Sequence, residues 1–311
     1  MKKAILLLLC VFMIGLPLFA KGGEDKSGGK DFVIAFANVN DVFPYLVKVR
    51  SYVQQFAGEK GIKVLVGNAD SDLNKQVDQI ENFLVQGAKV IICVPADPDG
   101  IAPTANKCWA QGVPFFTVCG NTTGTSVHVG SLNYDAGVMQ ATYLKNTLPQ
   151  GGKVLYQHAD PVNQEYRDRR DGFFTLFKDR PDLELLAEQN TVNRGDLGMS
   201  VTETWLQQYP KFDAIVAQND DSALGAIEAL KAANVLKNVK VVGLDGSDPA
   251  LESIQNGEMA ATAFQNARGQ AQALVALVER YRSGENPKSF QNVAIPFEVI
   301  TKQNVSQFIG R

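Results

Sequence analysis

The chain has 311 residues, of which 45% are hydrophobic and 20% charged, with a formal net charge of −3 at pH 7. The small acidic balance, without a cluster of lysines or arginines, argues against a nucleic-acid-binding protein and against binding to anionic membranes. The length suits two domains better than one.

The first 20 residues have the layout of a secretory signal peptide. Two lysines precede an apolar run, residues 4–14, which a glycine and a proline then interrupt, and Ala20 offers a small residue for cleavage. A membrane anchor is the rival interpretation, but a spanning helix needs about 20 mainly apolar residues. A lipoprotein cleaved before Cys10 is a second alternative, although the run before Cys10 is short. We therefore expect export to the periplasm with residues 1–20 removed.

A polar, glycine-rich stretch follows, and we expect residues 21–30 to form a flexible tether. Beyond it lie three cysteines, Cys93, Cys108 and Cys119, without CxxC spacing. They are expected to be buried, inert thiols. One disulfide stays open as an alternative, and a zinc site lacks the paired ligands that it needs.

Strand-like and helix-like segments alternate from residue 31 onward. Apolar runs of about six residues between amphipathic stretches of about 12–18 residues are typical of βαβ units around a buried parallel sheet. In the first series, strands are expected in 32–37, 62–67, 89–95 and 113–118, and helices over 47–56, 73–85 and 101–110.

The same alternation restarts after residue 126. Strands are expected in 127–129, 153–157, 183–189, 212–218, 240–246 and 259–265, with helices from about 134, over 164–177 and 199–208, from 222 and after 249. The expected fold class is therefore α/β, with two doubly wound parallel-sheet domains and helices on both faces of each sheet.

Polar, amide-rich segments follow the predicted strands. In open α/β sheets, ligands bind outside the carboxyl ends of the strands. The segments there include QHADPVNQ, QNTVNRGD, QNDDS, LDGSD and FQNARG. Two such edges that face each other would form a cleft lined with amides, acids and an arginine.

Catalytic and cofactor motifs are weak by comparison. His128 alternates inside a strand and is expected to be structural, while His158 ends a strand without a GxSxG elbow nearby. No GxxxxGK[ST] or GxGxxG cradle for a phosphate is present in the sequence. We therefore expect no cofactor.

A calcium-like loop from Asp70 to Glu81 has Lys75 where such a loop needs glycine. Asp72 is better interpreted as the N-cap of the helix that follows. We therefore expect no metal site.

The residues at the strand ends suit a polyol. Aspartate accepts hydrogen bonds, arginine donates them, and amides do both, which matches sugar hydroxyls. Asp245, Arg167, Asn219 and Gln265 lie at or just beyond predicted strand ends, and Tyr45 lies at a helix start.

Three segments, VAQNDDSALGAIEAL, VVGLDGSDPALESIQNGEMAATAFQ and YRDRRDGF, together resemble the periplasmic sugar-binding proteins of the ribose-binding type. These are the substrate-binding subunits of bacterial ABC importers. The effector domains of lactose-repressor-type regulators share the pattern but carry an N-terminal helix-turn-helix, where this chain has a signal peptide and a tether. The resemblance spans essentially the whole body, from Phe32 to about Ile300.

The resemblance implies a type I periplasmic binding protein whose two domains are joined by a three-strand hinge. The hinge is expected near residues 130–131, 265–266 and 295–296. The domains are then 31–130 with 266–295, and 131–265 with 296–311. Together with the strand-end pattern it implies these ligand-binding residues: Phe43, Tyr45, Asn163, Arg167, Asn193, Asn219, Asp245 and Gln265.

The sequence departs from the family pattern in ways that bear on the ligand. An Asp-Arg or Asn-Lys pair is expected after the fifth strand, but Cys119 and Gly120 stand there, with Asn121 next. Phe43 replaces an asparagine and Asn193 replaces a stacking aromatic. These changes argue against ribose, glucose and galactose as ligands.

The expected function is a secreted, monomeric binding protein that closes on a small neutral sugar or polyol-like ligand and delivers it to the membrane permease of an ABC importer. A sensory receptor for a furanosyl signal or a nucleoside-like molecule, with a chemoreceptor as partner, is the alternative. An enzyme that uses Asp220, Asp221 or Asp245 is disfavoured because these acids are surrounded by amides rather than by a polarised nucleophile or a metal.

Overall fold

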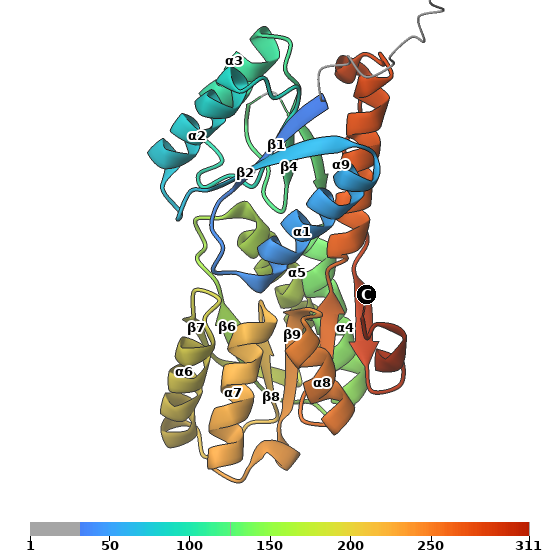
Figure 1. The fold of residues 1–311 in the computed structure, drawn as a ribbon. Helices are drawn as coiled ribbons and strands as arrows, with labels where there is room; N and C mark the ends of the chain where they lie inside the picture. The colour runs from blue at the N-terminus through green and yellow to red at the C-terminus, as the bar shows by residue number, and fades with distance from the viewer. Residues whose placement is uncertain (1–31, 125, 311) are drawn as a thin grey trace, which may run out of the picture. The chain divides into compact units, whose positions relative to one another are not determined.

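The computed structural model describes residues 32–124 and 126–310. The predicted signal peptide and tether lie outside these residues. No helix in the described ranges is long and apolar enough to cross a membrane. The described body contains two six-stranded sheets, each with helices on both faces (Figure 1).

The first sheet has the strand order β11-β5-β4-β3-β1-β2, and its paired strands run parallel. Helices α1 and α9 cover one face and α2 and α3 the other. The strands are β1 (Phe32–Asn38), β2 (Ile62–Asn68), β3 (Ile91–Cys93), β4 (Phe115–Val118), β5 (Val127–Gly130) and β11 (Val293–Ala294). The helices are α1 (Pro44–Glu59), α2 (Leu73–Val85), α3 (Ala102–Ala110) and α9 (Ala267–Arg282).

The second sheet has the order β12-β10-β9-β8-β6-β7, with only the edge strand β12 antiparallel among its described pairs. Helices α4 and α5 cover one face and α6, α7 and α8 the other. The strands are β6 (Gly152–His158), β7 (Leu183–Asn190), β8 (Ala214–Ala217), β9 (Lys240–Asp245), β10 (Ala261–Phe264) and β12 (Glu298–Thr301). The helices are α4 (Asn133–Thr147), α5 (Gln164–Asp179), α6 (Gly195–Gln208), α7 (Asp220–Ala232) and α8 (Asp248–Asn256), with 3-10 turns at Leu236–Asn238, Pro287–Ser289 and Val305–Gln307.

These elements confirm the predicted alternation and the predicted fold class. The sequence patterns did not predict α9 or the antiparallel pairing of β12. The chain changes sheet between β5 and β6, between β10 and β11, and between β11 and β12.

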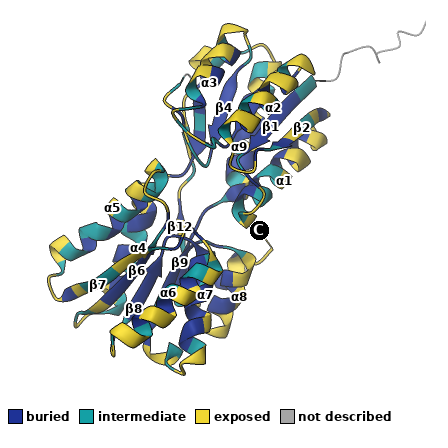
Figure 2. Cartoon of the chain, turned by 90° about the vertical axis from the view of Figure 1, so that its left-hand side faces the viewer, coloured by how far each residue is buried: buried dark blue, intermediate teal, exposed yellow. Residues whose placement is uncertain are grey.

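Strands buried on both faces explain why the sequence shows continuous apolar runs. In β1, Ile34 and Phe36 pack under α1 and α9, whereas Ala35 and Ala37 face α2 and α3. Figure 2 shows the strands as buried and the outer faces of the helices as exposed. Each large apolar side chain buried in this way contributes roughly 1.5–3 kcal/mol.

Two glycines let α4 and α5 cross closely. A Cβ atom at Gly137 would lie 2.0 Å from the carbonyl oxygen of Arg169, and one at Gly172 would lie 2.1 Å from that of Tyr134. Side chains at these positions would force the helices apart. The crossing therefore fixes where α5 presents Arg169.

Two smaller predictions can be compared with the structure. Asp72 is the N-cap of α2 and accepts a hydrogen bond from the Lys75 backbone N–H, as predicted. Cys93 and Cys108 are buried and Cys119 is partly buried, and all three are free thiols, so the disulfide alternative is not formed.

Candidate ligand-binding site

A cavity of ≈370 Å³ lies at the carboxyl ends of strands from both sheets. Its lining residues come from the loops after β1, β2, β3 and β4 of the first sheet and after β6, β7, β8, β9 and β10 of the second. Both sheets therefore contribute to one site, as expected from parallel strand ends.

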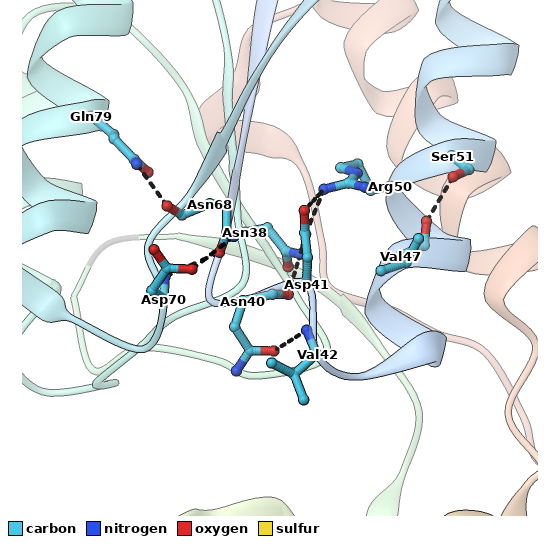
Figure 3. Close-up of polar contacts among 10 residues, drawn as sticks. All are labelled: Asn38, Asn40, Asp41, Val42, Val47, Arg50, Ser51, Asn68, Asp70 and Gln79. Atoms are coloured by element: carbon cyan, nitrogen blue, oxygen red, sulfur yellow. Dashed lines mark hydrogen bonds and ion pairs between the residues drawn. The ribbon is translucent and has the colours of Figure 1, made fainter.

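The loop after β1 is held by its own polar network, shown in Figure 3. Asn38 Nδ2 donates to Asp41 Oδ1 at 2.7 Å, and Arg50 donates to the same carboxylate. The Arg50 hydrogen bond lowers the pKa of Asp41. Asn40 Oδ1 accepts from the Val42 backbone N–H at 3.1 Å. This network fixes the loop that precedes Phe43 and Pro44, which line the cavity.

Aromatic side chains follow that loop. Phe43 and Tyr45 flank Pro44, the first residue of α1, and all three line the cavity. The Tyr45 hydroxyl donates to Gln270 Oε1 at 3.0 Å, and burial raises the pKa of this tyrosine. The hydrogen bond to α9 holds the ring in place.

Arg169 is the arginine of the cavity, and it is 6% exposed. Its Nε donates to Asn133 Oδ1 at 2.8 Å, its Nη1 to the Gln218 carbonyl at 3.0 Å, and its Nη2 to Gln265 Oε1 at 3.3 Å. The guanidinium lies 5.5 Å from the ring centroid of Tyr166. Arg169 therefore ties α4, β8 and the end of β10 together beneath the site.

Two amides follow β7 and β8. Asn193 Nδ2 donates to the Tyr166 hydroxyl at 2.7 Å, and the Asn193 carbonyl accepts from Asn219 Nδ2 at 3.1 Å. Asn219 Oδ1 accepts from the Ser222 backbone N–H at 3.0 Å and caps α7. Asp220 and Asp221 do not cap this helix, because both lie inside its first turn.

Three carboxylates gather at the start of α7 and the end of β9. Asp220 is 1% exposed and accepts from Thr262 Oγ1 and the Ser247 backbone N–H, each at 2.7 Å. Burial raises the pKa of Asp220 to about 7. Asp221 and Asp245 line the cavity, and burial raises the pKa of both.

Glu165 of α5 reaches the turn where the charged anchor was expected. A Cβ atom at Gly120 would lie 3.4 Å from Glu165 Oε1. Burial raises the pKa of Glu165. The charge beside Cys119 and Gly120 thus comes from the second sheet's helix, not from the turn itself.

Three cavity residues have left-handed backbones. Cys119, Asn193 and Asp245 have φ values of 64°, 59° and 122°, and each lies at or just after a strand end. Strained backbone of this kind concentrates at ligand sites, where surrounding structure holds it in place. Here it turns the chain so that these residues line the cavity.

The profile of the family described as Periplasmic binding protein domain matches residues 34–286. This chain belongs to that family. The fold is the type I periplasmic binding protein fold, and the relatives are sugar-binding proteins of the ribose-binding type.

Three relatives illustrate the similarity. The ribose import binding protein of Bacillus subtilis is 29% identical over 85% of this chain and 88% of its own. The D-apiose import binding protein of Actinobacillus succinogenes is 32% identical over 90% and 91%. The crystal structure of the Caulobacter myo-inositol binding protein with myo-inositol has a TM-score of 0.83 and 30% identity, covering 90% and 96%.

Most of the residues predicted for the site of this periplasmic binding protein line the cavity. They are Phe43, Tyr45, Asn163, Asn193, Asn219, Asp245 and Gln265. Whether they contact a ligand stays a prediction.

Arg167 is not among the lining residues. It is exposed and donates to the carbonyls of Pro161 and Val162 and to Gln164 Oε1. The arginine that lines the cavity is Arg169, two residues after the predicted one. Two residues turn about 200° around a helix, so Arg167 and Arg169 do not lie on the same side of α5.

Sequence reasoning also missed Asn40, Glu165, Tyr166 and Asp221 as lining residues. Glu165 and Tyr166 follow the same strand end as Asn163. The segment after β6 could therefore have indicated them as site residues.

Asp220 and His128, two titratable side chains that a catalytic site could use, both have partners within the protein. Asp220 is committed to Thr262 and Ser247. His128 Nδ1 lies 3.0 Å from Thr117 Oγ1, and burial lowers the pKa of this histidine to about 4. Across the described residues, no group of three or more histidine, cysteine, aspartate or glutamate side chains is arranged to hold a metal ion.

Proposed function

We propose that this protein is an extracytoplasmic solute-binding protein that binds a small sugar or polyol-like ligand and delivers it to an ABC importer. The observation that carries the proposal is the ≈370 Å³ cavity, which strand ends of both sheets line with amides, carboxylates and aromatic rings. Amides and carboxylates match hydroxyl groups, and aromatic faces cover the C–H side of a ring. Relatives named for ribose, D-apiose and myo-inositol support this ligand class.

The three passages of the chain between the sheets supply the hinge in this proposal. They lie after β5, after β10 and between β11 and β12. A ligand that contacts both sheets has a higher affinity for the closed arrangement, and so shifts the population toward it. The permease then binds the closed form.

The proposed compartment is the periplasm, reached through the predicted signal peptide, and the proposed state is a monomer. The sensory alternative has the same ligand-binding step and differs only in the partner protein that binds the closed form. Identifying that partner therefore distinguishes a chemoreceptor from a permease, whereas identifying the ligand does not.

A thermal-shift screen of sugars and polyols tests the proposal, after native mass spectrometry of the purified protein for a co-purified ligand. At a ligand concentration of about 100 times Kd, binding stabilises a protein by about 2.7 kcal/mol. For a chain of this size we expect the melting temperature to rise by about 5–10 °C. The absence of any shift across the screen, or turnover of a compound, would overturn the proposal.

A further inference from the structure

The cavity holds more acidic than basic side chains. Glu165, Asp221 and Asp245 line it, with the exposed Asp160 at its edge. Arg169 is the one basic side chain among the described lining residues. A carboxylate that is removed from water is costly to ionise unless a cation lies beside it. The excess of acidic side chains therefore needs a positively charged partner.

Arg169 forms no ion pair with these acids among the described residues. Its three nitrogen atoms each donate to a neutral acceptor, on Asn133, Gln218 and Gln265. Its positive charge lowers the pKa of both Glu165 and Asp245, yet burial outweighs it and the pKa of each stays raised. One arginine therefore does not neutralise the site.

The carboxylates have few partners of their own. Among the described residues, the carboxylate of Asp221 has no hydrogen bond or ion pair, and no side chain hydrogen-bonds to the carboxylates of Asp245 and Glu165. None of the three meets a cation in an ion pair within the described part of the chain, so their oxygen atoms can accept from a ligand.

Amide side chains in the same cavity offer hydrogen-bonding atoms in addition to the acids. Gln265 is 4% exposed and Asn193 is 8% exposed. Gln265 Nε2 and Asn193 Oδ1 have no hydrogen-bond partner in the described ranges, although the opposite atom of each amide is bonded. Neither atom is fully buried, so each is open to the cavity and can bond to a ligand. One free donor and one free acceptor suit hydroxyl groups.

Two further cations lie next to the cavity, and neither forms an ion pair with its acids among the described residues. Lys48 pairs with Asp248 at 3.1 Å, and the guanidinium of Arg268 lies 5.2 Å from the ring centroid of Phe56. Both line an adjoining cavity of ≈190 Å³, which Asp221 and Asp245 line as well, and neither lines the ≈370 Å³ cavity. Phe43, Tyr45 and Tyr166 line the larger cavity, and an aromatic face attracts a cation.

We propose that the ligand is a polyhydroxylated compound that carries a protonated amine, and that Glu165, Asp221 and Asp245 receive the ammonium group. This inference rests on the proposed function and replaces the sequence expectation of a neutral ligand. Hydroxyl groups of the same ligand would meet Gln265 and Asn193. The specificity is then set by acids that all belong to the second sheet and its helices.

Isothermal titration calorimetry at pH 7 with matched ligand pairs tests the inference. The probes are myo-inositol against an aminodeoxy-inositol, and D-glucose against D-glucosamine. We expect the amine of at least one pair to bind about tenfold more tightly than its hydroxyl analogue, because an ammonium group adds charge–charge attraction to the hydrogen bond that a hydroxyl group would also donate to a carboxylate.

Variants then assign the preference to the acids. Asp221→Asn removes a carboxylate that has no partner in the protein, so the fold should tolerate it. Alone and combined with Glu165→Gln, it should reduce the amine preference to about threefold or less. Glu203→Gln, an exposed acid on α6, is the matched control and should leave the preference unchanged.

The outcomes separate the two proposals. Equal or tighter binding of the hydroxyl analogues in both pairs would overturn this inference and leave the proposed function standing. A preference that persists in the Asp221→Asn, Glu165→Gln variant would remove these acids as its cause. No binding by any of the compounds would count against the proposed function and the inference together.

Discussion

Lys48 Nζ lies 3.1 Å from Asp248 Oδ1, and this ion pair joins α1 on the first sheet to the first turn of α8 on the second. The pair forms at the edge of the adjoining smaller cavity. Both side chains are partly exposed, at 31% and 73%, so the pair is a weak contact that depends on the two sheets being close.

Lys48→Ala is therefore expected to weaken ligand binding modestly. An exposed ion pair contributes about 0.2–1 kcal/mol, so Kd should rise by no more than about fivefold. The difference from the unmodified protein should shrink at high salt, because salt screens exposed charges. Calorimetry at low and high salt measures it. A loss well beyond tenfold would show that Lys48 contacts the ligand itself.

Arg169→Met should reduce ligand binding far more than Lys48→Ala does, and should also reduce stability. The substitution leaves the acceptors on Asn133, Gln218 and Gln265 without their donor in a buried place. We expect the free energy of unfolding to fall by about 2–4 kcal/mol and ligand binding to be lost. Urea denaturation and calorimetry measure the two effects.

Arg167→Ala is the matched control for that experiment, two residues away on the same helix. Its side chain is exposed and bonds to its own loop, so stability should change by less than about 1 kcal/mol and Kd by less than about threefold. If Arg167→Ala abolishes binding while Arg169→Met does not, the sequence placement is right and the structural one is wrong.

Asp220 gives a prediction for the pH dependence of stability. Burial raises the pKa of its carboxyl group to about 7 in the folded state, above the ordinary value of 3.8. The folded state then holds a proton that the unfolded state has released, so this group's contribution is complete below pH 4 and is lost as the pH rises to about 7.

Asp220→Asn should therefore show a smaller decline in the free energy of unfolding between about pH 4 and pH 7 than the unmodified protein. Denaturation at a series of pH values measures this slope. Glu203→Gln, which changes an exposed acid on α6, serves as the control. Identical slopes in the Asp220→Asn variant and the unmodified protein would contradict the raised pKa.

Gly137→Ala should destabilise the α4–α5 crossing. Its added methyl group would lie 2.0 Å from the Arg169 carbonyl oxygen, so the helices must separate, at a cost of about 1–3 kcal/mol. Because the crossing positions Arg169, ligand affinity should fall as well. Thermal melting and calorimetry measure both changes.

Gly58→Ala, in α1, is the matched control. No atom lies within 4 Å of its added methyl group. Alanine is a better helix former than glycine, so this variant should gain about 0.5–1 kcal/mol of stability with unchanged binding. A Gly137→Ala variant that is as stable as Gly58→Ala would show that the two helices do not need the close approach.

Much of the fold could be predicted from local pattern. The apolar run of β1 and the periodic apolar residues of α2 each identify their element, because burial on two faces or on one stripe dictates composition. The antiparallel pairing of β12 left no such trace, since pairing direction depends on which distant strand it meets.

The sequence by itself determined that polar residues follow each strand and that Asn193, Asn219 and Asp245 lie near a site, because parallel strands end at one edge. Only the tertiary structure decided that Arg169, not Arg167, faces the cavity, since that depends on how α5 is rotated against α4. It also decided that Glu165 reaches the turn at Gly120. A contact between elements of different sheets depends on the packing of the whole body, which no local pattern encodes.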